Sequence, residues 1–110
     1  MTVDTRLATY GTLAPGQVNE RVLAQLEGRW LRGVVRGRLI EAGWGAEHGC
    51  PGMRPDANGD EIEVHLFESA ELPQHWRRLD AFEGPGYERI PILVLTDEGE
   101  IEASIYALKP

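Results

Sequence analysis

Residues 30–42, WLRGVVRGRLIEA, are rich in β-branched side chains but also carry Gly33 and Gly37. Glycine is unfavourable inside a helix, and inside a strand it marks a bulge or a sharp bend. This segment therefore predicts a strongly curved strand, which is typical of a small barrel.

Four further segments follow strand patterns. Residues 6–10 are a short strand candidate, and residues 61–68 alternate between apolar and polar side chains, as a half-buried strand does. Residues 87–96 and 100–108 read as two strands joined by a hairpin turn.

Two helices are predicted between these strands. The first ends near Gly28 and places Val18, Val22, Leu23 and Leu26 at helical spacing. The second begins at Ser69 as N-cap, tolerates Pro73 in its first turn, and has an apolar face of Leu72, Trp76, Leu79 and Phe82. Residues 43–60 are rich in turn residues and predict a long loop.

The order of elements is therefore β, α, β, β, α, β, β. Because strands dominate and neighbouring strands mostly pair antiparallel, we expect an α+β fold. Its architecture is a compact antiparallel sheet or small barrel that carries two helices. The length of 110 residues suits a single domain over residues 1–110.

The charge of the chain limits the classes of partner that it could bind. Lysine and arginine number 11 and aspartate and glutamate 18, for a net charge of −7. This argues against nucleic acid and anionic membranes as partners. No apolar run reaches the ~20 residues of a membrane span, and the first residues lack a signal-peptide pattern. With a single cysteine, Cys50, we expect a cytoplasmic protein.

Metal and nucleophile motifs are weak. His48, His65 and His75 show no ligand spacing, so no metal is predicted. Cys50 lies two residues from His48, but neighbours in a loop need not face each other. Residues 11–16, GTLAPG, lack the lysine of a phosphate-binding loop; their backbone N–H groups can still converge on an anion or a carbonyl oxygen.

Glu83 ends the second predicted helix, directly before Gly84. The negative end of the helix dipole disfavours a carboxylate there, and Asp80 lies three residues earlier on the same face. Both effects predict a raised pKa for Glu83, partly offset by Arg77 and Arg78. Taken alone, this pattern fits either a functional carboxyl or an ordinary acid at a frayed, solvated helix end.

Two motifs far apart in the chain resemble those of the γ-glutamylcyclotransferase-like family. They are YGTL at residues 10–13 and LDAFEG at residues 79–84, the latter followed by Tyr87 and Arg89. The pair is more specific than either half, and the resemblance covers nearly the whole chain. It is greatest to the short bacterial members. It implies a small mixed, mostly antiparallel β-barrel with two main helices packed around it.

The resemblance also implies an activity. Enzymes of this family cyclise a γ-glutamyl group to 5-oxoproline and release the attached amine, without metal or cofactor. The family's catalytic glutamate corresponds to Glu83, which would be the general acid/base. The family's binding loop corresponds to Tyr10, Gly11, Thr12 and Leu13, although many members have serine in place of Thr12. The partner is a small γ-glutamyl amide or amine, whose amine half the sequence does not identify.

This chemistry suits a basic carboxyl. The attacking α-amine arrives as an ammonium and must lose a proton, whereas the leaving amine must gain one; a single carboxyl can do both. Backbone N–H groups of residues 11–13 can stabilise the oxyanion of the addition step or bind the substrate α-carboxylate. The sequence does not decide between these two anions.

Three other residues complete the hypothesis. Tyr87 and Arg89 should face the same side of their strand. Arg89 either orients Glu83 or pairs with Asp80, where an exposed ion pair would be worth only ~0–1 kcal/mol. Tyr10 either lines the pocket or packs in the barrel.

Two alternatives to an enzyme remain open. One is a catalytically silent small-molecule binding module of the same fold. The other is a purely structural barrel with a protein partner. The sequence leaves the oligomeric state open as well.

Overall fold

The computed structural model describes residues 2–10, 16, 21–40 and 52–109. Its strands are β1 (Arg6–Thr9), β2 (Arg29–Ile40), β3 (Gly52–Pro55), β4 (Asp60–Glu68), β5 (Tyr87–Thr96) and β6 (Gly99–Leu108). Its helices are α1 (Arg21–Ala24) and α3 (Trp76–Glu83), and 3₁₀ turns occur at η1 (Val3–Thr5) and η2 (Leu72–Gln74).

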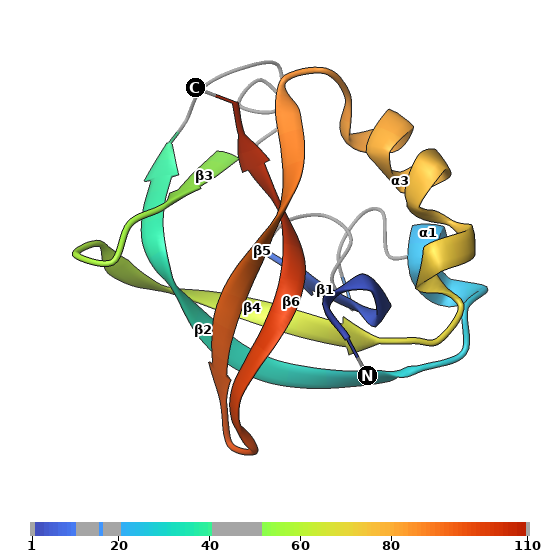
Figure 1. The fold of residues 1–110 in the computed structure, drawn as a ribbon, viewed down its shortest axis with the longest axis horizontal. Helices are drawn as coiled ribbons and strands as arrows, with labels where there is room; N and C mark the ends of the chain where they lie inside the picture. The colour runs from blue at the N-terminus through green and yellow to red at the C-terminus, as the bar shows by residue number, and fades with distance from the viewer. Residues whose placement is uncertain (1, 11–15, 17–20, 41–51, 110) are drawn as a thin grey trace.

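Five of the six strands in the described residues close into a barrel (Figure 1). Their order is β2-β4-β1-β6-β5, and β5 returns to β2 through the pairs Gly33–Thr96 and Val34–Leu95. β3 pairs with the C-terminal part of β2, on the same edge as β5 and opposite β4. The β1–β6 pairing is parallel and the others are antiparallel. The small mixed, mostly antiparallel barrel with two helices is therefore confirmed.

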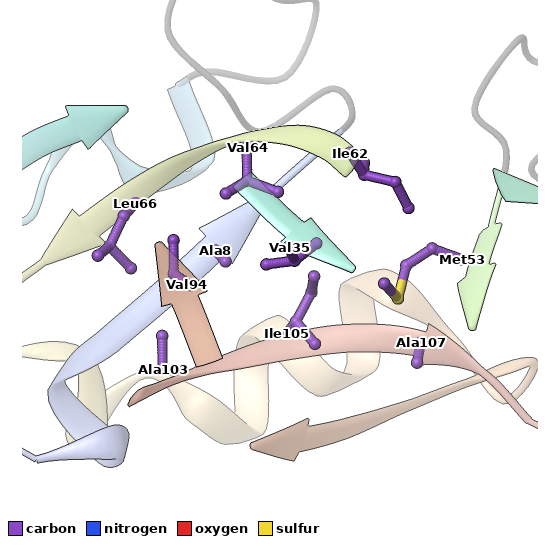
Figure 2. Close-up of a cluster of buried hydrophobic side chains, with 10 residues drawn as sticks. All are labelled: Ala8, Val35, Met53, Ile62, Val64, Leu66, Val94, Ala103, Ile105 and Ala107. Atoms are coloured by element: carbon purple, nitrogen blue, oxygen red, sulfur yellow. The ribbon is translucent and has the colours of Figure 1, made fainter. Parts of the chain in front are cut away.

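Two apolar clusters stabilise the barrel, one on each side of its wall. The interior cluster (Figure 2) consists of Ala8, Val35, Met53, Ile62, Val64, Leu66, Val94, Ala103, Ile105 and Ala107. The outer cluster lies between the barrel and the helices and consists of Leu7, Leu23, Leu26, Phe67, Leu72, Trp76, Leu79 and Tyr106. β6 supplies both clusters, because alternate residues of a strand face opposite sides.

The glycines of β2 allow close approach of neighbouring strands. A side chain at Gly33 would place its Cβ 2.6 Å from Val94 Cγ1 and 2.8 Å from the Leu95 carbonyl oxygen. At Gly37 it would lie 2.5 Å from the carbonyl oxygen of Arg54. The predicted curved strand is present, and Gly33 lies where β2 meets β5 to close the barrel.

The prediction of a loop over residues 43–60 is wrong for the second half of this segment. β3 lies within it and pairs with β2 from Gly37–Pro55 to Ile40–Gly52. β3 has no apolar–polar alternation that would have revealed it. A turn from Asp56 to Gly59 follows, closed by the Gly59 N–H donating to the Asp56 carbonyl at 2.8 Å. Residues 43–51 lie outside the described part of the chain.

The first predicted helix ends before Gly28, and the second is divided in two. The first covers Arg21–Ala24, and residues 17–20 lie outside the described ranges. Gly28 does not have the positive φ of a helix-ending glycine; a Cβ there would meet the Glu68 carbonyl oxygen at 2.2 Å. The second divides into η2 and α3, with the Ser69 hydroxyl accepting the Glu71 N–H at 3.1 Å. Phe82, predicted on its apolar face, is 38% exposed.

The predicted hairpin is confirmed. β5 and β6 pair from Tyr87–Leu108 to Thr96–Gly99, and Gly99 has a φ of 100°. In the parts of the chain that the structure describes, no helix is both long and apolar enough to cross a membrane.

Candidate active site at the end of α3

Glu83 is the last residue of α3, and the backbone fixes where the helix ends. Gly84 has a φ of 91° and a ψ of 177°, a conformation nearly restricted to glycine. Its N–H donates to the Asp80 carbonyl at 3.1 Å. The chain then enters β5, and the Lys109 N–H donates to the Gly86 carbonyl at 3.0 Å. The turn after Glu83 is thereby attached to the residue that follows β6.

The Glu83 carboxyl has an unusual proton affinity. The residue is half-buried, and burial raises its pKa from 4.5 to about 7. The predicted direction of the pKa shift is confirmed, but its cause is different. Burial, which penalises the charged form, is its cause in place of the charge of Asp80.

Asp80, one turn earlier, behaves in the opposite way. Its Oδ1 accepts hydrogen bonds from the Tyr106 hydroxyl at 2.6 Å and from Arg89 Nε at 3.0 Å. Partial burial alone would raise the pKa of Asp80, but these two donors outweigh it and hold the pKa below its ordinary value. Two carboxyls one helical turn apart thus have pKa values shifted in opposite directions, an arrangement typical of acid/base sites.

Tyr106 is a site residue that sequence reasoning missed. It is 4% exposed, and burial together with the hydrogen bond to Asp80 raises the pKa of its phenol, so it remains a donor. The charge of Glu83 raises this pKa further, which reflects its proximity to Tyr106. The sequence feature that could have revealed it is a tyrosine within the apolar run ASIYAL, since a buried phenol requires a hydrogen-bond partner.

Tyr10 and Arg89 connect to the same group. The Tyr10 hydroxyl donates to the Tyr106 carbonyl at 2.7 Å, while the Tyr10 ring packs against the interior cluster. Arg89 lies over the Trp76 ring, with its Cζ 4.2 Å from the ring centroid, while it pairs with Asp80. Of the two roles predicted for Arg89, the structure shows the pairing.

Tyr87 packs against the outer cluster, which includes Trp76. It therefore faces the same side of β5 as Arg89, as the alternation predicted.

Other predicted positions lie apart or outside the description. Residues 11–13, His48 and Cys50 are not among the described residues. His65 lies edge-on to Trp30, with ring centroids 6.5 Å apart. His75 Nδ1 is 3.2 Å from Arg78 Nη2. Among the described residues, no group of three or more His, Cys, Asp or Glu side chains could hold a metal ion.

Several solved structures share the fold of this chain. YkqA from Bacillus subtilis has a TM-score of 0.74 and 29% identity over 96% of this chain, which spans only 36% of YkqA. An AIG2-like protein from Mus musculus has a TM-score of 0.72 and 24% identity, covering 94% of this chain and 76% of that one. PH0828 from Pyrococcus horikoshii has a TM-score of 0.61 and 19% identity, and the match covers 96% of this chain and 80% of that one. The latter two likenesses concern the fold alone.

The family follows from the sequence. The model of the family described as gamma-glutamyl cyclotransferase, AIG2-like, matches residues 7–110, and the chain belongs to this family. No curated protein matches the chain at a significant level.

Proposed function

We propose that the protein is a γ-glutamylcyclotransferase that converts a small γ-glutamyl amide or amine to 5-oxoproline and the free amine. Membership of the family supports the reaction class. The observation that carries the proposal is Glu83, a half-buried carboxyl with a pKa of about 7. At neutral pH such a group is present in both protonation states, so it can accept a proton and return it.

The reaction requires one proton acceptor and one proton donor. Ionised Glu83 takes a proton from the substrate α-ammonium, and the free α-amine attacks the γ-carbonyl carbon. A new C–N bond forms and the carbonyl electrons move to its oxygen. Protonated Glu83 gives its proton to the departing nitrogen, and the original amide C–N bond breaks as the carbonyl re-forms. Glu83 then moves the surplus proton of the attacking nitrogen to the released amine, which leaves as an ammonium ion. No water is consumed, and the carboxyl ends as it began.

The remaining binding residues are assigned from the family motifs. We assign the loop Tyr10, Gly11, Thr12 and Leu13 to the substrate anion groups, with Tyr87 and Arg89 beside them. Two contacts support a shared site. The Tyr10 hydroxyl is hydrogen-bonded to Tyr106, and Arg89 is paired with Asp80, one turn from Glu83.

A panel of γ-glutamyl amines, γ-glutamyl amino acids and glutathione tests the proposal. The purified protein is incubated with each, and 5-oxoproline is followed by mass spectrometry. Product from at least one compound is expected. Saturable binding of a compound without any product from the panel would instead support the catalytically silent binding module.

Glu83→Gln tests the role of the carboxyl. The amide is nearly isosteric but cannot accept a proton from the ammonium. We expect 5-oxoproline release to fall by roughly 10²- to 10⁴-fold, the usual contribution of positioned proton transfer. The variant should remain folded by circular dichroism.

The matched control is Glu88→Gln, the same change on an exposed residue of β5, which should keep the parent rate. Asp80→Asn is not a suitable control, because Asp80 accepts the hydrogen bonds of Tyr106 and Arg89. A Glu83→Gln protein that cyclises at the parent rate would exclude Glu83 as the acid/base.

A further inference from the structure

We propose that Tyr106 is a positioning residue: with Arg89 it holds Asp80, and this Asp80 clamp fixes the last turn of α3 so that the Glu83 carboxyl stays in its buried position. The inference rests on the proposed role of Glu83 as acid/base. It adds a residue outside both family motifs and gives Asp80 a function.

The clamp acts within one helical turn of Glu83. Asp80 precedes Glu83 by three residues, so both side chains lie on the same face of α3. The Asp80 carbonyl also accepts the Gly84 N–H at 3.1 Å, which forms the end of the helix. A displacement of Asp80 would therefore move the backbone that carries Glu83.

α3 needs such a clamp because it is short. It has eight residues, and at its N-cap, His75, no side-chain hydrogen bond caps the first turn. Isolated helices of this length are unstable in water, so tertiary contacts must determine its geometry. Its buried side chains, Trp76 and Leu79, attach its first half to the barrel. The Asp80 clamp supplies the attachment of its second half.

Tyr106 is the more important donor of the two. The Asp80–Arg89 pair is partly solvated, with side-chain exposures of 47% and 27%, and such pairs hold geometry weakly. The Tyr106 hydroxyl comes from a residue that is 4% exposed, in the part of β6 (residues 103–108) that is buried on both faces, and lies 2.6 Å from Asp80. Tyr106 is thus a rigid donor, and the Tyr10 hydroxyl on its carbonyl, at 2.7 Å, orients it further.

The charges within the clamp are balanced. The positive charge of the Arg89 guanidinium compensates the negative charge of the Asp80 carboxylate, and the guanidinium is itself stacked on Trp76. Burial is therefore the property of Glu83 that depends on the clamp, because a loosened last turn would expose the carboxyl to water. Among the described residues, the charged and titratable groups at this end of the barrel are Arg77, Arg78, Asp80 and Glu83 on α3, Tyr87, Glu88 and Arg89 on β5, and Tyr106 on β6.

Tyr106→Phe is the test, because it removes the hydroxyl and leaves no buried polar group without a partner. The carboxyl ¹³C signal of Glu83 is followed by NMR across pH 3–9 in the parent and the variant. We expect the Glu83 titration to move from about 7 toward the ordinary value of 4.5. We also expect 5-oxoproline release to fall by roughly 10- to 100-fold, since a displacement of about 1 Å can cost that much.

Ser104→Ala is the matched control. Ser104 lies on the same face of β6, is 3% exposed, and donates its hydroxyl to the Val3 carbonyl at 2.8 Å. The Ser104→Ala variant loses a comparable hydrogen bond away from Asp80. Its Glu83 titration and its rate of 5-oxoproline release should therefore match those of the parent. A shift of equal size in Ser104→Ala would show a general loss of rigidity and overturn the proposal.

Two further outcomes are decisive. A folded Tyr106→Phe protein with an unchanged Glu83 titration overturns the clamp. If Tyr106→Phe does not fold, Asp80→Ala decides in its place: it removes the acceptor of both hydrogen bonds, and an unchanged Glu83 titration overturns the clamp. A parent protein that makes no 5-oxoproline refutes the proposed function, while the NMR titration still tests the clamp.

Discussion

At the scale of single residues, the molecule separates two carboxyls that share a helix face. Asp80 is ionised because Tyr106 and Arg89 donate to it, whereas burial raises the pKa of Glu83 to about 7. The ionised form of Glu83 is therefore disfavoured in the folded state. A group of this kind has a cost to stability that depends on pH.

Glu83→Gln should accordingly stabilise the protein at neutral and alkaline pH. The pKa of Glu83 is raised on folding, so its favourable contribution is complete below pH 4.5 and is lost as pH rises through about 7. The gain in unfolding free energy of the variant over the parent should be near zero at pH 4 and reach about 1–3 kcal/mol at pH 8. Urea denaturation at both pH values measures it. An equal difference at the two pH values would contradict a raised pKa.

At the scale of elements, barrel closure depends on one glycine. β2 and β5 join through only two residue pairs, and one of them contains Gly33. A side chain at this position would meet Val94 and the Leu95 backbone, and a backbone atom cannot rotate away as a flexible side chain can. Closure therefore requires that this residue have no Cβ.

Gly33→Ala should destabilise the protein by roughly 1–3 kcal/mol, the usual cost of overpacking. The matched control is Gly86→Ala, because a Cβ at Gly86 would meet no atom within 4 Å and its φ is not positive. Thermal unfolding followed by circular dichroism compares the two. Equal melting temperatures for the two variants would mean that β2 can move away from β5 at little cost.

At the scale of the whole molecule, the buried carboxylate of Glu68 forms ion pairs with residues from distant parts of the barrel. Glu68, 4% exposed, accepts from Arg6 Nε at 2.8 Å and from Arg29 Nε at 2.6 Å. Arg29 also pairs with Glu98 at 2.9 Å, in the turn between β5 and β6. This group links β1, β2, β4 and the hairpin turn.

Glu68→Gln should lower the free energy of unfolding by roughly 1–3 kcal/mol at pH 7. Burial alone would raise the pKa of Glu68, but Arg6 and Arg29 together hold it below its ordinary value of 4.5. The stabilisation is thus present above pH 4.5 and is lost as pH falls below it, so the difference from the parent should narrow toward pH 3. Denaturation midpoints at pH 3, 5 and 7 measure this.

Glu61→Gln is the control for this change. Its partner Arg36 lies 3.8 Å away, both side chains are more than half exposed, and such pairs contribute only ~0–1 kcal/mol. An equally large effect in both variants would assign the loss to net charge and not to the buried group.

The sequence by itself determined much of the local structure. The alternation in residues 61–68, the hairpin at 97–99 and the end of a helix at Gly84 all correspond to features of the fold. These features depend on neighbours within a few residues, which a local pattern contains. The position of Glu83 at a helix end also led to the right direction for its pKa shift, although the cause of the shift is burial.

The tertiary structure alone decided how the site is assembled. Tyr106 lies 26 residues from Asp80 and 96 from Tyr10, and the pairing of β2 with β5 joins residues about 60 positions apart. β3 was missed because four residues without alternation carry no strand signal until β2 lies beside them. Burial, the cause of the Glu83 pKa shift, is likewise set by what surrounds the carboxyl in space. Contacts between distant residues exist only once the barrel is closed, and no local pattern encodes that closure.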